Sequence, residues 1–213
     1  MKNRSCTKAG LKRFGRHNRT TKERILIVCE GEKTEPKYFN AIRTDLRLST
    51  ADVKCVPSDQ GTNPLNVVAS ALNKIDADNA WDRVYCVFDR DEHSHFDDAV
   101  RKVRENSRQL KNDEGSEISF EYIVSNPCFE LWLLLHFESV TAEKSSREVL
   151  DRLKTYVKKY SKGCDSVYAD TKDNLQTAYM NERRICGNAN GTVINNPYTN
   201  AGTLVKLLFE LKS

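Results

Sequence analysis

Short apolar segments alternate with helical patterns between residues 25 and 124, and this alternation constrains the fold most. Residues 25–29 form a continuous apolar run that is typical of a strand buried on both faces. Similar strand patterns follow at 53–56, 83–88 and 118–124, with helical patterns between them. Strands that alternate with helices pair in parallel through right-handed crossovers. The sequence therefore predicts an α/β fold with a doubly wound, mostly parallel sheet of about four strands.

The pattern changes after residue 125. Three helical patterns follow at about 128–138, 146–160 and 171–185, and the second opens with a Ser145-x-x-Glu148 capping box. A polar loop precedes a final helix that is expected from about Thr199. We therefore expect three parts, which are a basic, disordered tail at 1–24, an α/β core at 25–125, and a helical extension at 126–213 packed on the core.

The predicted tail carries an excess of positive charge. Residues 1–24 contain nine Lys or Arg and one acidic residue, Glu23, which gives a charge of +8. The whole chain carries +4, so the remaining residues carry −4. A basic tail can contact the phosphates of nucleic acid. The alternative is a solvated, disordered leader.

Composition excludes several classes of protein. The seven cysteines are odd in number and contain no Cys-x-x-Cys pair, which disfavours a cysteine zinc site and fits reduced thiols. The most apolar run, LWLLLHF at 131–137, is too short to span a membrane. The N-terminus has no apolar signal core. We therefore expect a cytoplasmic protein without a membrane partner.

Acidic residues without an evident neutralising partner follow three of the four predicted strands. Glu30 follows the first strand, Asp89 and Asp91 follow the third, and Glu130 lies beyond the fourth. In open parallel sheets, ligands bind outside the carboxyl ends of the strands. Clustered carboxylates repel one another unless a cation is present, and oxygen ligands suit Mg²⁺ or Mn²⁺. The sequence therefore predicts a divalent metal site formed by these four residues.

Residues beside these carboxylates are candidates for binding substrate. They are Lys33, Arg90, His93 and Asn126. One alternative stays open for the histidines, because His93 and His95 alternate with the two aspartates and could form a mixed site for a transition metal. The other interpretation places both histidines in a polar loop.

Glu130 has an interpretation without metal, and the segment after the first strand is similar to a phosphate-binding loop. Glu130 opens a predicted helix, where a carboxylate is favoured by the helix dipole without any metal. The segment GEKTE at 31–35 is similar to the end of a phosphate-binding loop, but Glu32 stands where the loop needs a second glycine. A carboxylate there would repel a triphosphate, so we do not expect this chain to hydrolyse ATP itself.

The motifs that carry these residues resemble a known fold and a known family. The strand–Glu–Gly segment at 25–31 and VFDRDEH at 87–93 resemble a TOPRIM domain, the metal-binding fold of topoisomerases and bacterial primases. ILIVCEGEKTEPKYF, SNPCFELWLLLHF and NPYTNAGTLVKLL together resemble the RloB family over most of residues 25–210.

The resemblance implies a TOPRIM-like protein, often paired with an AAA/ABC-type ATPase partner in bacterial restriction or phage-defence loci. Glu30 would perform general acid–base work, and Asp89 and Asp91 would hold the metal. The chain lacks a cysteine-rich primase module and the length for a topoisomerase's tyrosine domain. We therefore expect a metal-dependent nuclease that cuts DNA or RNA, with these three residues as catalytic groups.

Alternatives to a nuclease stay open. The chain could be a non-catalytic nucleic-acid-binding or regulatory subunit that docks on the ATPase. Nucleotidyl transfer at the same metal site is a third interpretation. The sequence leaves open a homo-oligomer and does not distinguish a DNA target from an RNA target.

Overall fold

The computed structural model describes residues 22–48, 51–90, 95–186 and 194–212. Most of the predicted tail and the predicted site residues Asp91 and His93 lie outside the described residues. The strands are β1 (Glu23–Cys29), β2 (Ala51–Pro57), β3 (Arg83–Asp89), β4 (Ser119–Asn126) and β5 (Tyr198–Thr199). The helices are α1 (Thr34–Leu46), α2 (Pro64–Ala77), α3 (Phe96–Asn106), α4 (Glu130–Leu134), α5 (Ser146–Tyr156), α6 (Val167–Thr171), η1 (a short 3-10 helix, Lys172–Asn174), α7 (Leu175–Cys186) and α8 (Ala201–Glu210).

Within the described residues, five strands form one sheet in the order β2-β1-β3-β4-β5. β1 pairs in parallel with both β2 and β3, and β3 pairs in parallel with β4. β5 runs antiparallel to β4. The predicted α/β class and the doubly wound, mostly parallel sheet are therefore confirmed, as expected for a TOPRIM-like fold.

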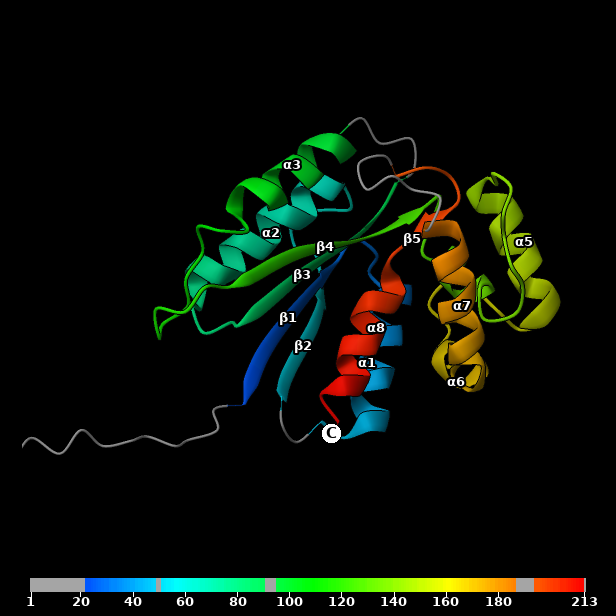
Figure 1. Cartoon of the computed structure of the whole chain (residues 1–213), viewed down its shortest axis with the longest axis horizontal. Helices are drawn as coiled ribbons and strands as arrows, with labels where there is room; N and C mark the ends of the chain where they lie inside the picture. Colours follow the sequence, from blue (N-terminus) through cyan, green and yellow to red (C-terminus); the bar gives the residue numbers. More distant parts are fainter. Residues whose placement is uncertain (1–21, 49–50, 91–94, 187–193, 213) are drawn as a thin grey trace, which may run out of the picture.

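Helices cover both faces of the sheet (Figure 1). α2 and α3 pack on one face, where their apolar residues meet Leu26 and Val28 of β1. α1 and α8 lie on the other face, where Ile25 and Ile27 point, and α5, α6 and α7 lie farther out (Figure 1). Successive residues of a strand point to opposite faces. This explains why the apolar run of β1 is continuous, since both of its faces are buried.

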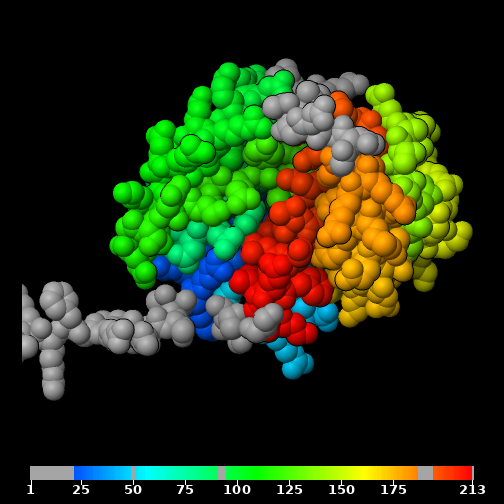
Figure 2. Space-filling model, in the orientation of Figure 1, coloured from blue at the N-terminus to red at the C-terminus, as the bar shows by residue number. Residues whose placement is uncertain are grey.

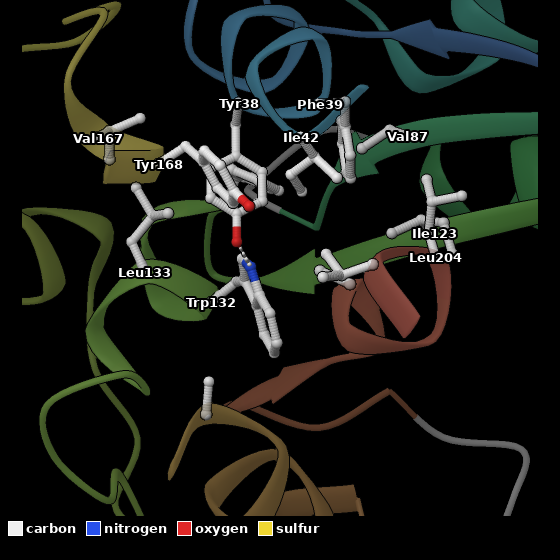
Figure 3. Close-up of a cluster of buried hydrophobic side chains, with 14 of the residues drawn as sticks. Tyr38, Phe39, Ile42, Val87, Ile123, Trp132, Leu133, Val167, Tyr168 and Leu204 are labelled. Carbon is white, nitrogen blue, oxygen red and sulfur yellow. Dashed lines mark hydrogen bonds between the residues drawn. The ribbon is translucent and has the colours of Figure 1, made fainter. Parts of the chain in front are cut away.

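The core on the α1 side is built from distant parts of the chain. Trp132 of α4 donates a hydrogen bond from Nε1 to the Tyr38 hydroxyl of α1 at 2.9 Å (Figure 3). The Tyr38 ring also makes edge contacts with Phe129 and with Tyr168 of α6. The surface view shows α8 packed between the sheet layer and α7 (Figure 2). The C-terminal helices therefore share one hydrophobic core with the sheet, and the boundary at residue 125 stays a prediction.

The helix predicted at 128–138 is shorter than expected. Only Glu130–Leu134 is helical. The chain then continues in turns, one of which is closed by a hydrogen bond from the Phe137 amide to the Leu134 carbonyl. Residues 131–135 are each 0 % exposed. A segment buried on all sides has no amphipathic pattern that could define its ends.

Across the described residues, no helix combines the length and apolarity needed to cross a membrane.

The end of the chain contains a strand that the sequence did not predict. Thr199 pairs with Ser125 in β5, so α8 begins at Ala201 instead of Thr199. Asn200 supports the junction, because its Oδ1 accepts a hydrogen bond from the Val124 amide at 2.7 Å. A two-residue strand is too short to show an alternating pattern.

Other C-terminal helices differ less from the prediction. The pattern at 171–185 corresponds mainly to α7, with α6 and η1 before it. The capping box is confirmed, since the Ser145 hydroxyl accepts from the Glu148 amide and the Glu148 carboxylate accepts from the Ser145 amide.

His136 is a buried, neutral imidazole just beyond α4. The residue is 1 % exposed, and Nδ1 lies 3.0 Å from the Trp132 carbonyl oxygen, which can only accept. Nδ1 therefore carries the proton, and Nε2 has no hydrogen-bond partner in the described part of the chain. Burial lowers the pKa of His136 to about 4.

We expect acid to destabilise the protein through His136. The unfolded chain takes up this proton near the ordinary pKa of 6.5, so it binds more protons than the folded state between that pH and about 4. The stability from neutral His136 is complete above this window and decreases by about 3 kcal/mol as pH falls through it. His136→Asn, which keeps a donor for the Trp132 carbonyl, should flatten the pH dependence of urea unfolding. His95 is exposed, so the control variant His95→Asn should show the same pH dependence of urea unfolding as wild type. Equal pH dependence in wild type and His136→Asn would contradict the prediction.

Candidate functional site

The carboxyl ends of β1 and β3 meet where the strand order reverses. The chain passes from β1 to β2 on one side, and β3 then lies on the other side of β1. Glu30 and Asp89 lie at these two ends. The Glu30 amide donates to the Val87 carbonyl at 2.8 Å, and Glu30 Oε2 accepts from the Asp89 amide at 2.8 Å. In open α/β sheets this switch point is where a ligand-binding crevice forms.

A cavity of about 390 Å³ opens at this point and is lined by acidic residues. Four of the lining carboxylates come from three separate segments, namely Glu30, Glu35, Asp89 and Glu130. Glu30, Glu35 and Glu130 are only 9 %, 6 % and 4 % exposed. We call this the acidic cavity. The structure thus brings together three of the four residues predicted to hold metal and adds Glu35.

Glu35 reaches the acidic cavity because Gly31 has no side chain. A Cβ atom added to Gly31 would lie 2.2 Å from Glu35 Oε2, so any other residue at 31 would displace this carboxylate. Glu35 was not predicted as a site residue. In the sequence it looks like an ordinary acidic residue in the first turn of a helix, where the dipole favours it.

Repulsion and burial act on the carboxylates of the acidic cavity. The pKa of Asp89 lies well above its ordinary value, because burial removes water from the carboxylate and because Glu35, Glu30 and Glu130 add negative charge. Burial also raises the pKa of Glu35, with a further contribution from Glu130. The backbone amides of Glu35 and Gly31 and the charge of Lys162 oppose that rise. The cavity therefore favours any ligand that brings positive charge.

The donors in the acidic cavity fit a hard divalent cation in their chemistry. They are all carboxylate oxygens, which Mg²⁺ and Mn²⁺ prefer. The ligand geometry is not assembled, since no three His, Cys, Asp or Glu among the described residues stand close enough to hold a metal ion. Asp91, two residues after Asp89, lies outside the described residues. A bound cation would therefore need Asp91 or a change of side-chain rotamer.

The predicted substrate contacts divide into two groups. Lys33 lines the acidic cavity. The Arg90 guanidinium instead stacks on the Phe96 ring, 5.0 Å from its centroid, and donates to the Ile194 carbonyl. Asn126 Nδ2 donates to the same carbonyl at 3.3 Å. Arg90 and Asn126 therefore hold the segment before β5 and line a neighbouring polar cavity of about 1010 Å³.

A third hollow, about 680 Å³, lies between α7 and α8, away from these carboxylates. Its lining is mainly apolar and includes Tyr179, Met180 and Phe209. Burial raises the pKa of Glu182 there to about 7, and Glu182 Oε1 accepts from the Gly202 amide at 2.8 Å. The buried Glu182 carboxylate therefore has a structural role, since it binds the backbone amide of Gly202 in the first turn of α8. The acidic cavity is the better candidate site, because several titratable groups from separate segments converge on it.

The family profile described as RloB-like protein matches residues 25–208. This chain belongs to the RloB-like family. The match confirms the family expected from the three motifs, and it spans the strands, the acidic cavity and most of α8. A comparison with curated proteins and one with solved structures each gave no significant match.

Proposed function

We propose that this RloB-like protein is a divalent-metal-dependent nuclease that hydrolyses phosphodiester bonds in DNA or RNA. The convergence of Glu30, Glu35, Asp89 and Glu130 on one cavity at the switch point supports the proposal. Like charges are brought together at a cost in free energy, which a bound cation offsets. A phosphodiester is negatively charged, so the four carboxylates would repel it. A bound cation would remove this repulsion and allow the phosphodiester to approach.

The residues take separate roles in this proposal. Asp89 would hold Mg²⁺ or Mn²⁺ together with Glu30, and we expect Asp91 and Glu130 to contribute further oxygens. The ion would activate a water molecule and stabilise charge on the phosphorus-bound oxygens. Glu30, oriented by its hydrogen bond from the Asp89 amide, would accept a proton from that water and return one to the leaving oxygen.

Incubation of the purified chain with plasmid, single-stranded DNA and RNA, with and without Mn²⁺, tests the proposal. We expect cleavage that requires Mn²⁺ and that falls by about 100-fold or more in Glu30→Gln. Glu114→Gln is the matched control, because this exposed carboxylate lies in the turn before β4, at the opposite end of the sheet. Cleavage that persists in Glu30→Gln would contradict the assignment of this residue.

A non-catalytic subunit is the alternative. Such a subunit would use the acidic residues to dock on a partner, and millimolar Mn²⁺ would then leave the melting temperature unchanged. Nucleotidyl transfer would instead appear as product formation from nucleoside triphosphates. An ATPase partner, a role in phage defence and a cytoplasmic location are proposals that rest on the family resemblance.

A further inference from the structure

The connection between α5 and α6, residues 157–166, is attached to the first turn of α1 and to Glu130 of α4. The Tyr160 hydroxyl donates to Glu130 Oε1 at 3.0 Å. The Gly163 amide donates to Thr34 Oγ1 at 3.1 Å, and the Gly163 carbonyl accepts from Lys37 Nζ at 2.6 Å. These contacts fix the connection beside the acidic cavity on both sides of residue 162.

Gly163 is required for this close approach. Its φ is +79°, in the left-handed region that favours glycine, and an added Cβ would lie 2.6 Å from Lys33 Cβ. The backbone therefore packs directly against the loop that carries Glu30. These contacts hold the backbone on both sides of residue 162 in place.

Lys162 lies between these fixed residues and lines the acidic cavity. Its positive charge is close enough to lower the pKa of Glu35, against the effect of burial. The side chain is exposed, and it makes no ion pair within 4 Å among the described residues. Its ammonium group is therefore at the mouth of the cavity and available to a ligand.

We propose that Lys162 is a catalytic residue that contacts a non-bridging oxygen of the phosphate being cleaved. This inference rests on the proposed nuclease function. A phosphodiester held by metal at the carboxylates would leave its remaining oxygens toward the mouth of the cavity, where Lys162 supplies a compact positive charge. Charge that grows on those oxygens in the transition state would be stabilised by a cation already in place. The C-terminal helical extension thereby adds a second lysine to Lys33, which the α/β core already places on the lining of this cavity.

A simpler role for Lys162 is to neutralise the carboxylates when no metal is bound. The two roles predict different measurements. A phosphate-binding lysine affects oligonucleotide binding and turnover and leaves metal binding intact. A neutralising lysine affects stability without metal and leaves oligonucleotide binding unchanged.

The test compares wild type with Lys162→Met, Lys162→Arg and the control Lys159→Met, which removes an exposed lysine three residues earlier. Turnover of a labelled oligonucleotide is measured with Mn²⁺. Binding of a phosphorothioate oligonucleotide, which resists cleavage, is measured by fluorescence anisotropy over a range of salt concentrations. The change in melting temperature on adding Mn²⁺ reports metal binding separately.

For Lys162→Met we expect kcat to fall about 100-fold. The slope of the logarithm of the binding constant against the logarithm of the salt concentration is negative, and it should become shallower by about 0.7. This corresponds to one lost phosphate contact on a single strand. The Mn²⁺-induced shift should be equal to or larger than that of wild type, because a positive charge has been removed. Lys162→Arg should recover part of the turnover, and Lys159→Met should match wild type in each measurement.

The outcomes separate this inference from the proposed function. Unchanged turnover and binding in Lys162→Met would overturn the inference while cleavage by wild type keeps the nuclease assignment. Wild type that binds but does not cleave would overturn hydrolysis and the catalytic role of Lys162, and weaker binding by Lys162→Met would then leave only its contact with phosphate. Loss of the Mn²⁺ shift in Lys162→Met, or wild type that binds no oligonucleotide, would overturn the role of Lys162.

Discussion

Asp89→Asn is expected to abolish cleavage and, without metal, to raise the melting temperature. The carboxylate is held among Glu30, Glu35 and Glu130, and both burial and their repulsion raise its pKa. The amide removes that unfavourable charge, so the metal-free protein should become more stable. Cleavage should fall by about 100-fold or more, since the expected metal ligand is lost.

The same variant should lose its response to metal. Wild type in Mn²⁺ at 100 times its Kd should gain about 2.7 kcal/mol, measured by thermal unfolding with and without EDTA. Asp59→Asn is the matched control, because Asp59 follows β2 but forms an exposed ion pair with Lys74 and a hydrogen bond with Ser70. We expect Asp59→Asn to keep the Mn²⁺ shift and to lower the melting temperature slightly. A lower melting temperature for Asp89→Asn in EDTA would argue against the repulsion on which the site rests.

Trp132→Ala is expected to produce the largest loss of stability, about 3–5 kcal/mol. Trp132 is 0 % exposed, and its ring also contacts His136 and Tyr179. Truncation leaves a cavity and also leaves the Tyr38 hydroxyl without its donor, which adds a desolvation cost. Urea unfolding followed by circular dichroism measures this loss.

A milder pair of variants separates the hydrogen bond from the packing. Trp132→Phe removes the donor to Tyr38, whereas Trp81→Phe removes an indole Nε1 that has no partner in the described residues. We expect Trp132→Phe to cost about 1–2 kcal/mol more than Trp81→Phe. Equal costs would show that the hydrogen bond across the core contributes little to stability.

The part of the site that could be predicted from the sequence is the part that lies at the strand ends. Glu30 and Asp89 follow apolar runs directly, and parallel strands place their carboxyl ends at one edge. The order β2-β1-β3 then makes these two ends neighbours. The roles of these residues in metal binding and catalysis remain predictions, and Asp91 and His93 lie outside the described residues.

Other contacts at the site depend on folding that no local pattern encodes. Arg90 and Asn126 also lie at strand ends, yet both donate to the Ile194 carbonyl, which is 104 and 68 residues away from them in the sequence. Glu35 enters the acidic cavity because Gly31 leaves room for it. Each case depends on which groups meet in space, and sequence position alone does not specify that.

The sequence by itself determined the α/β class, the parallel strands, the capping box of α5 and the edge at which acidic residues collect. These features follow from hydrophobic period and from local hydrogen bonding, which act over a few residues. Only the tertiary structure decided that β5 closes the sheet, that Trp132 joins the C-terminal helices to α1, and that Lys162 lies at the mouth of the acidic cavity. These depend on contacts between distant segments, whose formation is governed by packing of the whole core.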